Sequence, residues 1–240
     1  RIILTDRVLT ARLIKGAKSP VYGVQTPITT CKAAVVFLGL ETTRNLVLTY
    51  TLRELFRTDS ALLRQRMTQL WRHSALVASV CYLVAGMTPG LDRERGMVAG
   101  LLHDIGVLPI IHYAARVPQL ARDATQLDAV IRGLRGQMGA MLLRRWKFGD
   151  ELVQVVLEAE AWQRDPQPHA DYADLVVASQ LVLGVDGGGT GVEPDAAELP
   201  ELEAVPATAK LARGTLDAEL AGQLRTEAEA DVANTLGLLN

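Results

Sequence analysis

Apolar residues recur at intervals of three and four along almost the whole chain, and strict alternation of apolar and polar residues is nearly absent. The first pattern places apolar side chains on one face of a helix, whereas the second is typical of a strand. The clearest example is the segment Ala61–Ala85, in which one broad stripe carries the apolar side chains. The sequence therefore predicts an all-α fold.

Further helices are expected between turns that glycine, proline and aspartate mark. Their predicted ranges are Asp6–Gly16, Thr29–Leu38, Glu41–Phe56, Arg93–Leu102, Ile105–Ala115, Asp123–Gly133, Met138–Trp146, Asp150–Trp162, Tyr172–Leu183 and Ala207–Leu239. Gly39 is expected to end the second of these helices. The segment Gly184–Pro206 contains Gly187–Gly188–Gly189, scattered acids and three prolines, and it is predicted to be a mobile acidic loop.

The composition of the chain argues against one class of partner. At 240 residues the chain is long enough to bury a large core. Its formal net charge is −2 and its isoelectric point is about 6.1, so it lacks the excess of basic residues that duplex binding needs. Nucleic acid is therefore not expected as a partner.

Two further patterns bear on location. Cys31 and Cys81 lie in apolar, helix-like surroundings, where free buried thiols are commoner than a disulfide in a chain of this length. The most apolar segment, Met97–Ala115, is interrupted by polar side chains at intervals shorter than a membrane crossing tolerates. We therefore expect a cytoplasmic protein with no membrane partner. The chain begins with Arg1 and not with methionine, and we interpret it as a fragment.

The segment Gly100–Val107 places a histidine and an aspartate, His103 and Asp104, side by side within an apolar stretch. Burial of a polar group without a hydrogen-bond partner costs roughly 2–7 kcal/mol, so such a pair needs partners or a function. These two residues are the first candidates for a functional site.

Six motifs, taken in chain order, resemble the HDOD domain. They are Tyr22–Gly23, the segment Ile28–Leu40 that ends in Leu38–Gly39–Leu40, Asn45–Leu46–Val47–Leu48, Trp71–Arg72–His73–Ser74, Gly100–Gly106, and Gly139–Ala140 followed by Leu142, Leu143 and Trp146. The resemblance spans about Asp6 to Ser179. It implies an all-α, HD-domain-like helical bundle with an additional N-terminal helical lobe.

HDOD domains are bacterial relatives of the HD metal-dependent phosphohydrolases, and they usually serve in signalling or regulation. The resemblance therefore implies a regulatory module. With a receiver-type module upstream on the same chain, it would be the output domain of a response regulator in a two-component system.

By the same resemblance, an HD-type metal site would use His73, the doublet His103 and Asp104, and an aspartate on a late helix. That last position falls on Ser179, whose hydroxyl is a poor ligand for a divalent cation. Asp174 lies five residues earlier, about 140° away around a helix, and cannot replace it without a change of register. We therefore expect no metal and no other cofactor. If a metal does bind, His73, His103 and Asp104 are its expected ligands.

Two histidine positions of the relatives are also changed. Arg135 stands where a histidine often precedes the Gly139 motif, and Glu158–Ala159–Glu160 stands where a pair of histidines is common. A catalytic metal needs open coordination positions and nearby cationic groups to hold phosphate. We therefore predict a non-catalytic regulatory domain that binds a protein or a nucleotide signal. The alternative is a metal-dependent phosphohydrolase that acts on a nucleotide or a cyclic dinucleotide.

In the non-catalytic interpretation, His73, His103 and Asp104 form a polar network that fixes the register of packed helices. A second hypothesis concerns a basic cluster of Arg144, Arg145 and Lys147 beside Trp146, with Arg132 and Arg135 one or two turns upstream; Arg135, Arg144, Arg145 and Trp146 are its candidate partner residues. This cluster is either a solvated face or a docking surface for an acidic partner, since interfaces favour Arg and Trp. The expected partners are other signalling proteins, among them a receiver domain on the same chain.

Gly187–Gly191 superficially resembles a phosphate loop. No lysine follows it as in a P-loop, and no strand is expected before it, so a flexible surface loop is the better interpretation.

These predictions divide the chain into four parts. Residues 1–56 are expected to form the N-terminal helical lobe, and residues 57–183 the HD-like bundle. Residues 184–206 form the acidic loop, and residues 207–240 form a C-terminal helical tail that completes the domain.

Overall fold

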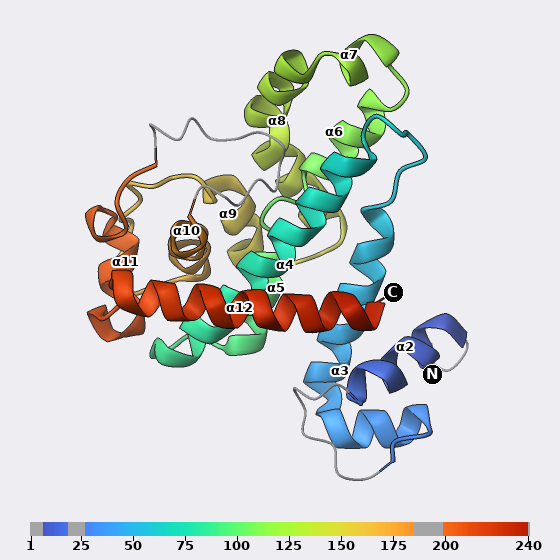
Figure 1. Ribbon diagram of the computed structural model, residues 1–240. Coiled ribbons are helices and arrows are strands. Elements are labelled where there is room, and N and C mark those ends of the chain that lie inside the picture. Colours follow the sequence, from blue (N-terminus) through green and yellow to red (C-terminus); the bar gives the residue numbers. More distant parts are fainter. Residues whose placement is uncertain (1–6, 19–26, 185–198, 240) are drawn as a thin grey trace. The chain divides into compact units, whose positions relative to one another are not determined.

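The computed structural model describes residues 7–18, 27–184 and 199–239, and every regular element within them is helical (Figure 1). The predicted all-α class is therefore confirmed. The helices are α2 (Arg7–Ala17), α3 (Cys31–Leu55), α4 (Arg64–Met87), α5 (Arg93–Leu102), α6 (Val107–Ala114), α7 (Pro118–Arg122), α8 (Ala124–Arg145), α9 (Asp150–Glu158), α10 (Tyr172–Leu183), α11 (Pro206–Lys210) and α12 (Ala218–Leu239), with short 3-10 turns at Leu202–Ala204 and Ala212–Gly214.

The chain divides into two compact units, which are described separately below. One unit comprises Arg1–Leu55 and Glu229–Asn240, and the other comprises Phe56–Ala228.

In the first unit, α2 packs on α3 around a small apolar core. This core contains Leu13, Ala17, Ile28, Cys31 and Ala34. At Gly39 the backbone of α3 takes φ 79° and ψ 167°, which is a conformation that glycine adopts far more readily than other residues. The sequence prediction that a helix ends at Gly39 is confirmed, because the two halves of α3 meet at this non-helical residue.

In the second unit, α4 and α5 lie against each other along the centre (Figure 1). The contact is close because Gly100 of α5 has no side chain: a Cβ there would lie 2.7 Å from the Cα of Ala78 and 2.8 Å from its backbone nitrogen. α10 packs against α4, α5 and α9, while α8 packs against α6 and α9. Aspartate side chains cap three of these helices, with Asp92 accepting from Arg95 N, Asp123 from Gln126 N, and Asp171 from Ala173 N and Asp174 N.

The prediction of two helices at Asp123–Gly133 and Met138–Trp146 is wrong, because α8 is continuous. Its glycines serve packing and do not end the helix. A Cβ on Gly136 would lie 3.1 Å from the backbone oxygen of Val156, so this glycine lets α9 approach the α8 backbone.

The predicted helical tail Ala207–Leu239 consists of more than one helix. Ala212, Arg213 and Gly214 all have positive φ, which interrupts the chain between α11 and α12. The backbone nitrogen of Ala212 donates to Thr88 Oγ1 at the end of α4, over 2.9 Å, and thereby holds the interruption in place.

Smaller differences concern ends and loops. α9 ends at Glu158 and not at Trp162, and the short helix α7 was not predicted. Most of the predicted acidic loop, including Gly187–Gly191, and the motif Tyr22–Gly23 lie outside the described residues.

Both cysteines are buried free thiols, as predicted. Two helical segments, Arg64–Met87 and Arg93–Ala114, are long and apolar enough to cross a membrane by composition alone. However, 56% and 78% of their most apolar windows are buried inside the structure, as is typical of core helices. They are weak evidence for a membrane span.

The α4–α5 contact yields a stability prediction. Gly100→Ala is expected to destabilise the protein by about 1–3 kcal/mol, because its methyl group would meet the α4 backbone, which cannot yield as a side chain can. Gly133→Ala is the matched control, since a Cβ there meets nothing within 4 Å and alanine favours a helix by about 1 kcal/mol. Urea unfolding of both variants measures the difference, and equal stabilities would contradict the proposed close contact.

Candidate functional site

Three polar side chains that the sequence singled out lie together in the core of the second unit. His73 lies in the middle of α4, His103 is the C-cap of α5, and Asp104 lies in the turn before α6. They are 9%, 2% and 2% exposed, respectively. The α4–α5 contact at Gly100 brings the end of α5 against α4 and so positions the doublet beside His73.

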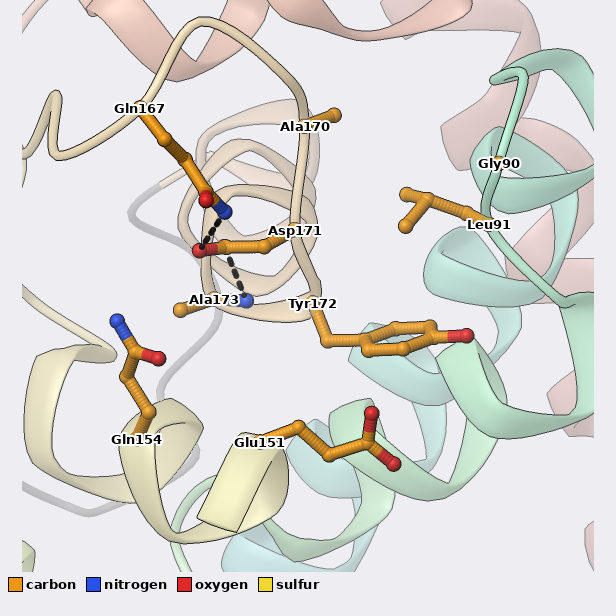
Figure 2. Close-up of a pocket in the computed structure, with 9 residues that line it drawn as sticks. All are labelled: Gly90, Leu91, Glu151, Gln154, Gln167, Ala170, Asp171, Tyr172 and Ala173. Atoms are coloured by element: carbon orange, nitrogen blue, oxygen red, sulfur yellow. Dashed lines mark hydrogen bonds between the residues drawn. The ribbon is translucent and has the colours of Figure 1, made fainter.

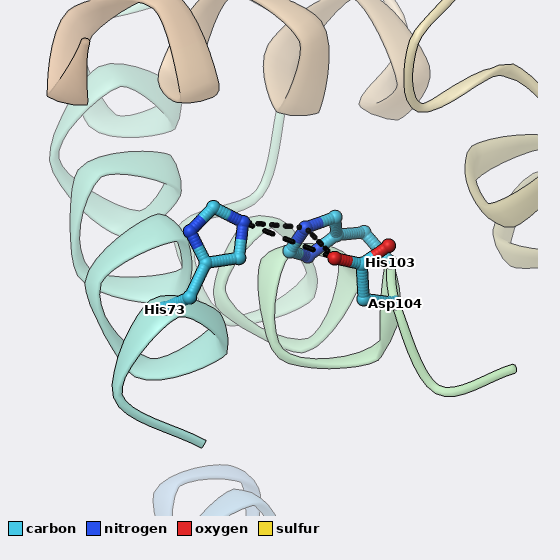
Figure 3. Close-up of side chains that lie close together, drawn as sticks. All are labelled: His73, His103 and Asp104. Carbon is cyan, nitrogen blue, oxygen red and sulfur yellow. Dashed lines mark hydrogen bonds and ion pairs between the residues drawn. The ribbon is translucent and has the colours of Figure 1, made fainter. Parts of the chain in front are cut away.

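One ligand atom from each of the three side chains lies within 4.8 Å of the other two (Figure 3). The Nε2 atoms of His73 and His103 are 3.2 Å apart. Asp104 Oδ2 lies 3.3 Å from His103 Nε2 and 3.9 Å from His73 Nε2. We refer to these residues as the His-His-Asp cluster.

A backbone carbonyl sets the roles of the two imidazoles. His103 Nδ1 lies 2.7 Å from the carbonyl oxygen of Gly100, and it must donate because a carbonyl only accepts. In the neutral ring, Nε2 of His103 then carries the lone pair, and His73 Nε2 donates to it. Such an outer hydrogen bond is also how metal-ligating histidines are commonly oriented.

Arg135 of α8 contributes the positive charge nearest to Asp104. Its Nη1 donates to Asp104 Oδ1 over 3.1 Å, and its Nη2 pairs with the carboxylate of Glu160. The Arg135 side chain is 12% exposed, whereas that of Glu160 is 43% exposed. Arg135 therefore connects the buried carboxylate to a second carboxylate near the surface.

Glycines allow α8 to come this close. A Cβ on Gly106 would collide with the carbonyl oxygen of Arg135 and lie 2.5 Å from the nitrogen of Gly139. Gly106 follows Asp104 by two residues, so the backbone contact at Gly106 holds the Arg135 turn of α8 beside Asp104.

Two buried atoms of the cluster have no hydrogen-bond partner, namely Asp104 Oδ2 and His73 Nδ1. Asp104 Oδ2 is the oxygen nearest the two imidazoles (Figure 3). The cluster therefore retains one acceptor that Arg135 does not satisfy.

The surroundings shift the ionisation of two members. Burial, together with the neighbouring His103, lowers the pKa of His73 to about 4. Burial alone would raise the pKa of Asp104, but His103 and the guanidinium of Arg135 outweigh it and hold that pKa well below its usual range. At neutral pH, His73 is therefore uncharged and Asp104 is a carboxylate.

The structure does not bring Ser179 into the cluster. Ser179 Oγ accepts a hydrogen bond from Cys81 Sγ over 3.3 Å, and Cys81 lies eight residues after His73 on α4, a rise of about 12 Å. Asp174 is engaged elsewhere, since its carboxylate pairs with Arg164 and with Lys210. Neither residue supplies a fourth ligand.

Only some residues of the predicted partner surface are exposed to solvent. Arg144, Arg145 and Trp146 are exposed at the end of α8, but Arg135 points inward to Asp104. Its assignment to a docking surface is therefore wrong. One signal of this role is present in the sequence, because the family resemblance implies a histidine at the position that Arg135 occupies.

A pocket of about 310 Å³ lies elsewhere in the second unit (Figure 2). Its lining residues are Gly90, Leu91, Glu151, Gln154, Gln167, Ala170, Asp171, Tyr172 and Ala173. The carboxylates that line the pocket already form ion pairs, Asp171 with Arg164 and Glu151 with Arg95. Sequence patterns did not predict this pocket, and its side chains do not include the His-His-Asp cluster.

The residues present do not complete a catalytic metal site of the HD type. Three donors converge, but among the residues that the structure describes no fourth carboxylate joins them. The permanently charged guanidinium of Arg135 also pairs with Asp104, the carboxylate that would bind a metal cation.

An all-helical bundle in which a buried His-Asp doublet faces a histidine on the neighbouring helix is characteristic of the HD class. The family model for the HDOD domain matches residues 1–162, which is more than half of the chain. The chain therefore belongs to the HDOD domain family.

Solved structures support the same fold. An HDOD domain protein of unknown function from Geobacter sulfurreducens matches with a TM-score of 0.70 and 24% identity, over 96% of this chain and 82% of that one. A presumptive metal-dependent phosphohydrolase from Shewanella amazonensis matches with a TM-score of 0.66 and 24% identity, over 95% of this chain and 82% of that one. A presumptive signal transduction protein from Marinobacter aquaeolei matches with a TM-score of 0.67 and 19% identity, over 99% of this chain and 53% of that one. At these identities the likeness concerns the fold alone, and no curated protein matches the chain.

The low pKa of His73 predicts a pH dependence of stability. The unfolded chain takes up a proton at this histidine near pH 6.5, whereas the folded protein does so only near pH 4. Between these values the unfolded state binds more protons, so stability falls as the pH is lowered, by up to ~3 kcal/mol.

Urea unfolding at pH 7.5 and pH 5 measures this effect. His73→Gln should lose less stability between the two pH values than the natural sequence does. His169→Gln is the matched substitution at an exposed histidine outside the cluster, and it shows the effect of replacing His by Gln elsewhere. An identical loss in His73→Gln and in the natural sequence would contradict the assignment.

Proposed function

We propose that this HDOD domain is a non-catalytic regulatory module that acts by binding another signalling protein or a nucleotide signal. The observation that carries the proposal is the ion pair between Arg135 and Asp104. A guanidinium neutralises the carboxylate that an HD-type phosphohydrolase would use to hold its metal.

The chemistry of arginine supports this proposal. Its guanidinium stays protonated at every accessible pH, it cannot ligate a metal, and it cannot activate a water. A divalent cation at Asp104 would lie close to this fixed charge and would have to displace it. Displacement would deprive a largely buried guanidinium of one of its two carboxylate partners, which is unfavourable.

In this proposal the His-His-Asp cluster stabilises the joint between α4, α5 and α8, and the partner binds elsewhere on the domain. The partner is another signalling protein, for which a receiver domain joined to the same chain is one candidate. The proposed location is the cytoplasm, with no nucleic acid or membrane partner.

One observation favours the alternative, a metal-dependent phosphohydrolase acting on a nucleotide or cyclic dinucleotide. The ligand atoms of His73, His103 and Asp104 converge within 4.8 Å, and Gly100 orients His103 as an outer partner would. Under this alternative those three residues are the metal ligands and Arg135 moves away from Asp104.

The two functions differ in how metal affects stability. Arg135→Ala is expected to lower the free energy of unfolding by roughly 3 kcal/mol, because it leaves Asp104 buried without a cation. Added Mn²⁺ or Zn²⁺ should raise the Tm of this variant more than that of the natural sequence, since the vacated carboxylate can then bind a metal. Arg135→Lys keeps the charge and should respond less, and Arg132→Ala on the same helix should behave like the natural sequence.

Assays of the natural sequence decide between the proposals. We expect sub-stoichiometric metal in the purified protein and no phosphate release from nucleotides or cyclic dinucleotides with added Mn²⁺, Fe²⁺ or Zn²⁺. Near-stoichiometric metal together with phosphate release that His103→Ala abolishes would establish the alternative.

A further inference from the structure

From its middle to its C-terminal end and just beyond, α8 carries apolar and cationic side chains that are exposed on the second unit. Leu134 is 43% exposed, Met141 is 55% exposed and Trp146 is 41% exposed. Arg144, Arg145 and Lys147 are exposed beside them. We refer to these six residues as the α8 surface.

Helix geometry places four of these side chains on one face. Leu134 and Met141 are seven residues apart, so they lie within about 20° of each other around the axis and about 10 Å apart along it. Arg144 and Arg145 follow Met141 by three and four residues and therefore flank its direction, one turn further along. The face is an apolar stripe that ends in two cations.

The cationic side chains of this surface have no ion-pair partner among the described residues. Within the described parts of the chain, Arg144, Arg145 and Lys147 form no ion pair, unlike Arg135 and Arg164 of the same unit. These three cations lie within four residues at one helix end and have no carboxylate at ion-pair distance among the described residues, so they attract an acidic partner.

Lys147 adds a second, independent observation. α8 ends in a Schellman motif, in which Phe148 N donates to Leu143 O over 2.9 Å and Lys147 N donates to Arg144 O over 3.0 Å. This motif needs a left-handed residue, and Lys147 supplies it with φ 60° where glycine is the favoured residue. The chain thus accepts backbone strain at a position where the side chain adds a charge to the surface.

We infer that the α8 surface binds an acidic amphipathic helix of a partner protein. This inference rests on the proposed function and names the chemistry of its partner. Two apolar residues seven apart on the partner would pack against Leu134 and Met141, and carboxylates beyond them would pair with Arg144, Arg145 and Lys147.

Charge favours this occupant over a second copy of the same chain. In a two-fold symmetric dimer the same surface is contributed by both copies. A second α8 surface would add three further cations and no carboxylate, whereas an acidic helix would neutralise the three already present.

A pair of synthetic helical peptides tests the inference on the whole chain. Both carry leucines at seven-residue spacing, and one carries glutamates at the positions where the other carries lysines. Fluorescence anisotropy of the labelled peptides should show binding of the acidic peptide only, with an affinity that falls as salt is raised.

Variants localise the binding site. Arg144→Glu and Arg145→Glu should each weaken binding of the acidic peptide at least tenfold, and Met141→Asp should do the same. Arg132→Glu is the matched control, because Arg132 is also exposed on α8 but lies nine residues before Met141, on the opposite side of the helix. It should change the affinity less than twofold.

Lys147→Gly separates binding from folding. Glycine relieves the left-handed strain, so the Tm should stay the same or rise, while loss of the charge should weaken peptide binding about twofold to threefold. A purely structural role of Lys147 would leave the affinity unchanged.

Three results would overturn the inference: equal binding of both peptides, an equal effect of Arg132→Glu and Arg145→Glu, or self-association that Met141→Asp abolishes. Binding to vesicles of anionic phospholipid in place of the acidic peptide would also overturn it. These outcomes leave the metal and phosphate-release assays untouched, so failure here is distinguishable from failure of the proposed function.

Discussion

The second unit depends on one electrostatic requirement, the need of a buried carboxylate for a positive charge. Asp104 is 2% exposed and lies in the turn between α5 and α6, so its charge cannot be met by water. Arg135 meets it from α8, more than thirty residues later in the chain. The position of α8 is therefore coupled to the turn that follows α5, and through His103 and His73 to α4.

That electrostatic requirement can be met only because the backbones come close. Gly100 allows α5 to contact α4, and Gly106 allows the following turn to contact α8 next to Arg135. A side chain at either position would push apart the helices that carry the charged groups. Steric and electrostatic constraints thus act on the same short segment, which explains why a single motif of the sequence contains both the glycines and the His-Asp doublet.

Local patterns in the sequence were sufficient to predict most of the helices and the three residues of the His-His-Asp cluster, because amphipathic spacing and a family motif are both local signals. They failed where a residue serves a distant contact. Glycines of α8 suggested a break but accommodate the neighbouring α9 backbone. Arg135 suggested an exposed basic face, since nothing nearby in sequence shows that Asp104 faces it. The contact between Ser179 and Cys81 also joins residues 98 positions apart, and no local pattern indicates it.

The pairing of Arg135 with Asp104 also has a consequence for how the two positions can vary. The charge that balances Asp104 comes from a side chain of the same chain. A change at position 135 alone leaves a buried carboxylate without a cation, and a change at position 104 alone leaves a largely buried guanidinium with Glu160 as its remaining carboxylate. The two positions are therefore constrained as a pair, although 31 residues separate them in the sequence.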